Sequence, residues 1–175
     1  RRQRQMCIRD SYLAAGIPGT VKGMFSIHEL FGSKSMDDLI SPSVKLASEG
    51  FRLSAFQANN FNKYRKKFLN GSDSESIFIN SDDDDFSEGD VFTQTDLAES
   101  LRLIKDKGQK AFYEGEIAEK IVSDFSDNGG LITSQDLQDY EVYLKEPICG
   151  DYKQYNVCSM PLPSSGGIAI IQMLN

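Results

Sequence analysis

The sequence contains one histidine, three cysteines and no tryptophan among its 175 residues. A single histidine leaves no cluster of His and Cys ligands with metal-site spacing, and we expect neither a metal ion nor another cofactor. Three cysteines are too few to form the disulfide framework of a small secreted domain. The longest apolar run, Ile168–Leu174, is far shorter than the ~20 residues of a membrane-spanning helix.

Negative charge exceeds positive charge, with a formal net charge of −7. Because an acidic surface repels nucleic-acid phosphates and anionic lipid headgroups, we expect neither nucleic acid nor a membrane as a partner. A chain of this length suits a single domain. Residues 71–90 read as a loop, and their acidic run Asp82–Asp85 lacks the ligand register of an EF-hand. The triplet Asn70–Ser72 fits a glycosylation acceptor, although such triplets are common by chance.

Apolar residues recur at helical spacing through much of the chain. These patterns lie within residues 12–32, 35–51, 54–71, 95–108, 111–130 and 131–140. Ser35, Thr95 and Thr133 are predicted N-caps, the last with Asp136 in a capping box. We expect Pro42 to split the second pattern into an interrupted pair of helices. Three glycines are predicted to end helices: Gly32, Gly50 and Gly108.

After Tyr140 the pattern changes from helical spacing to alternation, which predicts two strands joined by a turn at Gly150–Asp151. Cys149 and Cys158 could face each other across this hairpin, and a disulfide there is one possibility. We favour the alternative that both are simply small strand residues. A loop rich in Pro, Ser and Gly follows, and an apolar helix or strand begins at Ile168.

Few residues could carry chemistry. The turn at Ser164–Gly167 could hold an anion on its backbone N–H groups, but it lacks the lysine of a phosphate-binding loop. A nucleophilic Ser164 or Ser165 would need an activating base, so we interpret the stretch as a structural turn, with substrate contact as the alternative. His28 reads as a packed or partly exposed residue at the edge of the core rather than a general base.

Three glutamates, Glu114, Glu116 and Glu119, precede or line a helix whose apolar face lies elsewhere, and we interpret them as solvated. The residues by themselves therefore predict no catalytic site.

Several stretches together resemble one family. They are "GIPGTVKGMFSIHELFG", "LISPSVKLASEGF", "GDVFTQTDLAESLRLIKDKGQKAFYEGEIAEKIV", "NGGLITSQDLQDYEV" and "PICGDYKQYNVCSMPLPSSGGIAIIQMLN". In this order and spacing they resemble the large-subunit region of gamma-glutamyltranspeptidases, also called glutathione hydrolases. The resemblance covers about residues 13–175.

The resemblance implies an α+β fold: a helix-rich part of a four-layer αββα sandwich of the N-terminal-nucleophile hydrolase class. In that family a precursor cuts itself into large and small subunits. The new N-terminal threonine of the small subunit attacks the γ-glutamyl amide of glutathione, with its own amine as base. Water or an amino acid then accepts the acyl group. The resemblance also implies a periplasmic or extracellular location.

No residue of this sequence matches a catalytic position of the family. The nucleophilic threonine belongs to the small subunit, and the arginine that holds the substrate carboxylate lies before "GIPGTVKG" in the family. We therefore expect residues 12–175 to be an incomplete large-subunit region that is inactive alone, with an apolar Ile168–Leu174 edge that promotes aggregation.

Residues 1–11, "RRQRQMCIRDS", show neither helical spacing nor strand alternation. Back-translated, they fit the transposon-end adapter used in sequencing-library preparation. We expect this segment to be translated adapter, with a native basic arm as the alternative.

Two competing hypotheses remain for function. A non-catalytic binding module of the same fold would lack the small-subunit threonine in its complete gene. An unrelated serine hydrolase would depend on Ser164 or Ser165.

Overall fold

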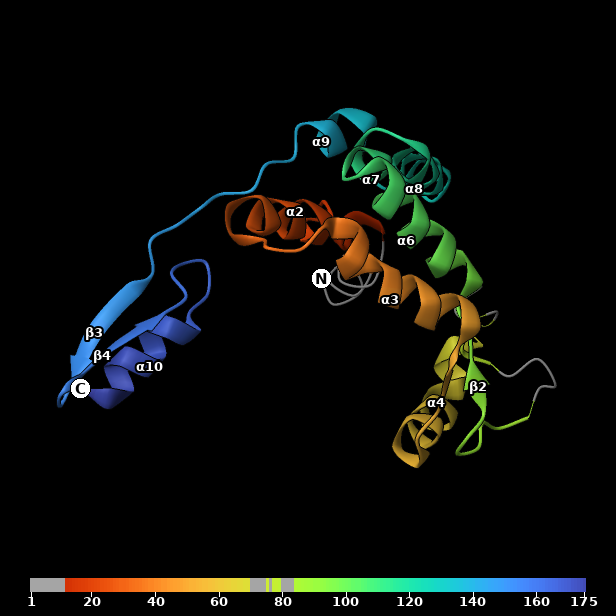
Figure 1. Cartoon of the computed structure of the whole chain (residues 1–175), viewed down its shortest axis with the longest axis horizontal. Helices are drawn as coiled ribbons and strands as arrows, with labels where there is room; N and C mark the ends of the chain where they lie inside the picture. Colours follow the sequence, from red (N-terminus) through yellow and green to blue (C-terminus); the bar gives the residue numbers. More distant parts are fainter. Residues whose placement is uncertain (1–11, 70–74, 76, 80–83) are drawn as a thin grey trace, which may run out of the picture. The chain divides into compact units, whose positions relative to one another are not determined.

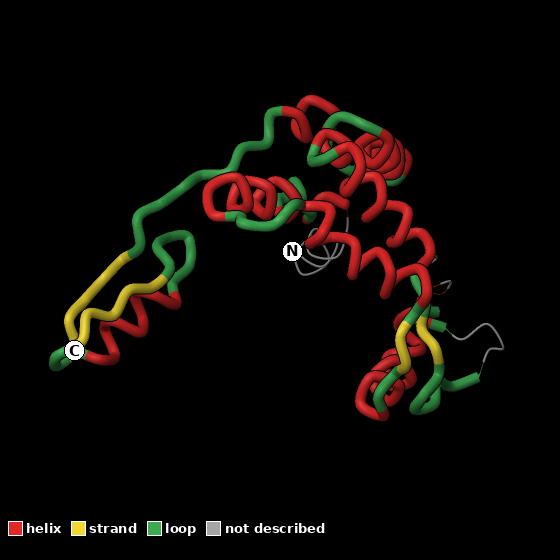
Figure 2. The backbone as a smooth tube through the Cα atoms, in the orientation of Figure 1, coloured by secondary structure: helices red, strands yellow, loops and turns green. Residues whose placement is uncertain are grey.

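The computed structural model describes residues 12–69, 75, 77–79 and 84–175, shown as a cartoon in Figure 1 and by secondary structure in Figure 2. Predictions for residues 1–11, for Asn70–Ser72 and for Asp82 and Asp83 lie outside the described residues. The chain divides into two compact units, Arg1–Tyr140 and Glu141–Asn175. Each unit is described by itself.

The first unit is mostly helical, and its two short strands pair antiparallel with Phe51 opposite Phe92. Helices α3 and α6 run side by side through it (Figure 1). Its elements are η1 (Tyr12–Ala14), α2 (Thr20–Phe31), α3 (Met36–Glu49), β1 (Phe51–Arg52), α4 (Ala55–Phe68), β2 (Val91–Phe92), α6 (Thr95–Lys107), α7 (Lys110–Tyr113), α8 (Glu116–Asp127) and α9 (Ser134–Gln138).

Most helix predictions are confirmed, including two of the three N-caps. The Ser35 hydroxyl accepts a hydrogen bond from the Asp38 N–H, and Thr133 forms a complete capping box with Asp136. Gly50 and Gly108 end α3 and α6 with positive φ angles of 79° and 71°, a conformation that glycine adopts without steric cost. Gly32 also ends its helix, but in an extended conformation.

Two predictions at helix boundaries are wrong. Pro42 does not split α3, which is one continuous helix from Met36 to Glu49. Ile40 and Ala47 are buried on the same helix, so tertiary packing outweighs the hydrogen bond that proline removes. The N-cap of α6 is Gln94 rather than Thr95. The backbone N–H of Gln94 donates to the Ala47 carbonyl at 2.8 Å, which keeps Gln94 outside the helix.

A hydrophobic cluster joins α7, α8 and α9. Tyr113, Ala118, Ile132 and Leu137 are its buried members, and Leu137 is fully enclosed. The helical apolar pattern predicted within residues 111–130 is confirmed in α8, because the side chains of Ile121, Val122 and Phe125 pack against this cluster.

A second, aromatic cluster packs around Phe92, which is 6% exposed. The rings of Phe61, Phe78 and Phe86 lie with their centroids 5.1–6.2 Å from the Phe92 ring. Residues 71–90 were predicted as a loop, but Ile77 and Phe78 are helical. The Phe78 ring packs against the Phe92 ring, and this contact between distant residues cannot be predicted from the local sequence.

The second unit is a β-hairpin covered by a helix: β3 (Ile148–Tyr152), β4 (Tyr155–Ser159) and α10 (Gly166–Leu174). The hairpin prediction is confirmed, but the turn lies at residues 153–154, because Tyr152 pairs with Tyr155. Gly150 and Asp151 are inside β3, where Gly150 lies against the side chain of Ile171 in α10. A Cβ atom at position 150 would overlap the Ile171 side chain, so this glycine serves packing and not the turn.

Cys149 and Cys158 form a disulfide, which overturns the preferred interpretation of two unlinked strand residues. The two residues are direct cross-strand partners with Cα atoms 4.1 Å apart. An odd, sparse set of cysteines gave no sign of a bridge in the sequence, whereas the strand register places the two residues opposite each other.

Candidate functional site

Among the described residues, α2, α3 and α6 form an apolar groove. Its volume is about 410 Å³. Met24, Ile27 and Phe31 of α2 face Leu39 and Ile40 of α3 across it. Carbon atoms dominate its lining, so the groove can hold apolar groups but offers few partners for a polar substrate.

His28 also lines this groove, and it is half-buried, as expected for a residue at the edge of the core. Its Nε2 atom lies 2.6 Å from the Lys34 carbonyl oxygen, a distance that indicates a hydrogen bond with the ring nitrogen as donor. This bond ties the end of α2 to the segment that leads into α3. In this tautomer Nε2 carries the proton and anchors the backbone, and among the described residues no carboxylate is seen to orient the ring as a general base would require.

The three glutamates singled out in the sequence are exposed, as predicted. Glu116 accepts a hydrogen bond of 2.7 Å from the Lys107 ammonium group. This hydrogen bond and the positive charge of Lys107 lower the pKa of Glu116. The pair links α6 to α8 on the protein surface.

The structure places Ser164 and Ser165 at the entrance to α10. The Ser164 N–H donates to the Pro161 carbonyl at 3.2 Å, and the Ser165 carbonyl accepts from the Ala169 N–H at 3.0 Å. Gly167 is buried against the Met160 carbonyl and the Ser159 side chain, which leaves no room for a Cβ atom. These contacts describe a tight turn that sets α10 on the hairpin.

Tyr113 of α7 is a buried tyrosine whose hydroxyl makes two hydrogen bonds to the backbone. This residue was not identified from the sequence. Its side chain is 3% exposed, and its hydroxyl donates to the Pro18 carbonyl at 2.7 Å and accepts from the Lys22 N–H at 3.1 Å. Burial raises the pKa of this hydroxyl. The Tyr140 ring stacks on the Tyr113 ring with centroids 6.0 Å apart.

The "GIPGT" stretch therefore has a structural role. The Pro18 carbonyl and, just after the stretch, the Lys22 N–H are hydrogen-bonded to the Tyr113 hydroxyl. Gly19 lies so close to Tyr140 that a Cβ atom on it would overlap the Tyr140 hydroxyl. No spacing rule connects these distant positions, so a single sequence carries no signal for the contact.

The described residues hold no cluster of three or more His, Cys, Asp or Glu side chains placed to bind a metal ion. Among these same residues, no helix is long and apolar enough to cross a membrane.

Known proteins match this scaffold along nearly its whole length. The sequence model of the family described as gamma-glutamyltranspeptidase matches residues 2–175. The glutathione hydrolase proenzyme of Bacillus subtilis is 40% identical over 161 residues, covering 92% of this chain and 27% of that protein. The glutathione hydrolase proenzyme of Escherichia coli is 41% identical over 166 residues, covering 94% and 28%.

The crystal structure of Helicobacter pylori gamma-glutamyltranspeptidase superposes with a TM-score of 0.90 at 43% identity. The match covers 96% of this chain and 48% of that one. The fold is thus a helix-rich α+β part of an N-terminal-nucleophile hydrolase. The chain belongs to the gamma-glutamyltranspeptidase family, and it spans between a quarter and a third of the length of the curated relatives above.

Proposed function

We propose that this chain is a scaffold region of an enzyme that cleaves the γ-glutamyl amide of glutathione and related compounds. The enzyme transfers the γ-glutamyl group to water or to an amino acid. The observation that carries the proposal is the match of residues 2–175 to the family, with about 40% identity to two glutathione hydrolase proenzymes.

The nucleophile in this proposal is an N-terminal threonine of a small subunit that a precursor releases. Support comes from the word proenzyme in the names of both relatives. The small subunit and an amino-acid acceptor are accordingly its proposed partners.

A periplasmic or extracellular location is part of the proposal. The Cys149–Cys158 disulfide supports it, since disulfides form and persist in oxidising compartments.

The test uses the source DNA. Primers placed within the codons for residues 12–175 would recover the surrounding reading frame, and the complete protein would be produced from it. We expect the purified protein to separate into two subunits and to release glutamate from glutathione. Replacement of the threonine at the new N-terminus by alanine is expected to abolish both events, and chain 1–175 alone is expected to be inactive.

Two outcomes would contradict the proposal. A complete protein that binds glutathione without turnover, and whose gene lacks the processing threonine, would be a binding module. Loss of activity in a folded Ser165→Ala variant, with the N-terminal threonine dispensable, would indicate a serine hydrolase.

A further inference from the structure

The Cys149–Cys158 disulfide lies on the outer face of the hairpin in the second unit. Both cysteines are exposed, whereas the alternate positions Ile148 and Gly150 are partly covered. Gly150 contacts Ile171, so α10 covers the face opposite the disulfide. A small solute can therefore reach the two sulfur atoms without any movement of α10.

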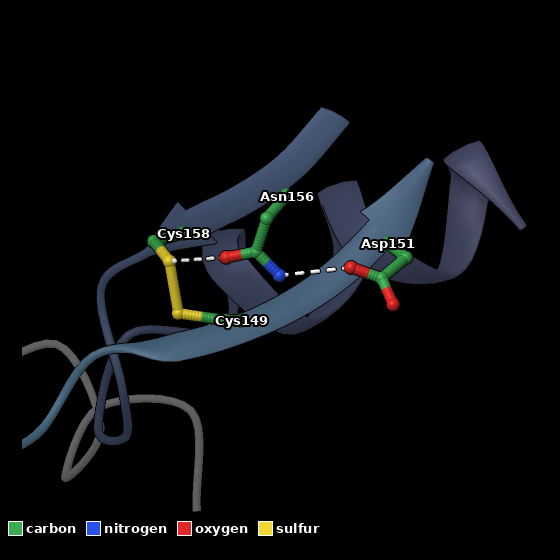
Figure 3. Close-up of a disulfide and its surroundings, with 4 residues drawn as sticks. All are labelled: Cys149, Asp151, Asn156 and Cys158. Carbon is green, nitrogen blue, oxygen red and sulfur yellow. Dashed lines mark hydrogen bonds between the residues drawn. A yellow bond between two sulfur atoms is a disulfide. The ribbon is translucent and has the colours of Figure 1, made fainter. Parts of the chain in front are cut away.

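The Asn156 side chain lies between the Cys158 sulfur atom and the Asp151 carboxylate (Figure 3). The Asn156 Oδ1 atom lies 3.2 Å from the Cys158 Sγ atom. The Asn156 Nδ2 group donates a hydrogen bond to the Asp151 carboxylate at 2.9 Å, which fixes the amide with its oxygen toward sulfur. The two cysteines therefore have different surroundings.

We propose that this disulfide is a thiol-exchange site, which low-molecular-weight thiols open and which reports the thiol level around the protein. Exposure provides the access that exchange requires. The proposal concerns the hairpin alone and does not depend on γ-glutamyl chemistry.

The reaction proceeds in two balanced steps. A thiolate attacks the Cys158 sulfur, a mixed disulfide forms, and the S–S bond breaks to release Cys149 as a thiolate that takes up a proton. A second small thiolate then attacks the sulfur of the small thiol in the mixed disulfide. The products are one small-molecule disulfide and the reduced pair Cys149 and Cys158, so two electrons pass to the protein.

The direction of the first step follows from Asn156. Its oxygen can accept a hydrogen bond from a Cys158 thiol, but it repels a Cys158 thiolate. Within the described hairpin the Asn156 oxygen lies against the Cys158 sulfur, so Cys149 is the better leaving group. Because a better leaving group departs faster, the incoming thiol bonds to Cys158.

The experiment uses chain 1–175 with Cys7→Ser, so that only the hairpin cysteines react. Glutathione is added, samples are quenched with acid and alkylated, and peptide mapping locates the glutathionyl group. S-methylglutathione, which keeps the γ-glutamyl group but has no thiol, is the matched reagent control. We expect a transient glutathionyl group on Cys158, followed by full reduction, and no reaction with the control.

Two variants test the local contacts. Asn156→Ala is expected to distribute the glutathionyl group over both cysteines, while Gln154→Ala in the nearby turn keeps it on Cys158. Asp151→Asn is expected to speed exchange with anionic glutathione roughly threefold at low salt, with a smaller effect at high salt. Circular dichroism checks that each variant remains folded.

Three results would overturn the proposal. One is a disulfide that glutathione opens only in denaturant, and another is a pair of cysteines already alkylated before any thiol is added. The third is a glutathionyl group that forms first on Cys149 in the unsubstituted hairpin, which would contradict the assigned direction. All three results are obtained by peptide mapping of the Cys7→Ser chain itself. They therefore do not depend on whether the variants at positions 151, 154 and 156 fold.

Discussion

At Gly19 the backbone passes directly over the edge of Tyr140, and any side chain would overlap the tyrosine hydroxyl. The contact matters because Tyr140 stacks on Tyr113, whose hydroxyl binds the backbone on either side of Gly19. A single residue without a side chain thus allows the N-terminal stretch to close over the core.

We expect Gly19→Ala to lower the free energy of unfolding by about 1–3 kcal/mol, since overpacking forces the backbone or the tyrosine to shift. Gly16→Ala is the matched control, because a Cβ atom there meets nothing within 4 Å. Urea unfolding of chain 1–175 measures both variants. Equal effects of the two substitutions would contradict the proposed contact.

The capping box of α9 predicts a dependence of stability on acid. Hydrogen bonds from the Thr133 hydroxyl and N–H lower the pKa of Asp136 below its usual value of 3.8. A carboxyl whose pKa is lower in the folded state stabilises the fold above the unfolded value, and this contribution is lost as the pH falls through the folded value. The loss therefore begins near pH 3.8 and continues below it.

Asp136→Asn is expected to remove this acid-dependent part of the stability, measured as the unfolding free energy between pH 5 and about 2.5. Thr133→Val should remove only part of it, since the hydroxyl donor is lost while the backbone N–H donor remains. Thr133→Ser keeps the hydroxyl and should behave as the unsubstituted chain. If the unfolding free energy of Asp136→Asn fell with pH as steeply as that of the unsubstituted chain, Asp136 would not be the source of the acid dependence.

At the scale of elements, α3 tolerates a proline in its interior. An alanine at position 42 would restore an N–H group that can donate to the Asp38 carbonyl, and alanine favours helix by about 3 kcal/mol over proline. Part of this gain is offset, because proline also restricts the unfolded chain.

We expect Pro42→Ala to raise the free energy of unfolding by about 1–2 kcal/mol. Ser43→Ala is the neighbouring control, and its effect should stay within about 0.5 kcal/mol. Thermal and urea unfolding together provide the measurement. A destabilised Pro42→Ala variant would show that the proline itself is needed for the path of α3.

The hairpin turn carries a similar local cost at Lys153, which has a positive φ of 53°. Glycine and asparagine adopt this region more readily than lysine. Lys153→Gly and Lys153→Asn are both expected to slow amide hydrogen exchange in β3 and β4, by a few-fold. Gln154→Ala is the control, and faster exchange in both Lys153 variants would refute the turn geometry.

At the scale of the whole chain, large apolar side chains remain exposed along the groove of α2 and α3. Phe31 is 79% exposed and Met24 is 56% exposed. Exposed apolar surface of this kind favours association with other surfaces. We therefore expect chain 1–175, produced alone, to self-associate at micromolar concentrations.

The double substitution Met24→Lys and Phe31→Glu is expected to weaken self-association about tenfold or more, because burial of such side chains contributes roughly 1.5–3 kcal/mol each. Phe56→Glu is the matched control, since Phe56 is 75% exposed on α4, outside the groove. Sedimentation velocity measures the association. A monomeric parent chain with a cooperative thermal transition would contradict the prediction.

Features that depend on neighbouring residues could be predicted from the amino-acid sequence alone. Ser35 and Thr133 cap helices through hydrogen bonds that span three residues, and Gly50 and Gly108 end helices through their own backbone freedom. Such signals are local, and they are readable in one chain. The ordered stretches also predicted the family correctly.

Features that join distant residues depend on tertiary packing and could not be predicted from local patterns. Packing of Ile40 and Ala47 kept α3 continuous through Pro42, and the register of Tyr152 with Tyr155 brought Cys149 opposite Cys158. The Tyr113 hydroxyl donates a hydrogen bond to the carbonyl of Pro18, which lies 95 residues earlier in the sequence. These outcomes depend on the free energy of nonlocal burial and hydrogen bonding, which local propensity and spacing do not contain.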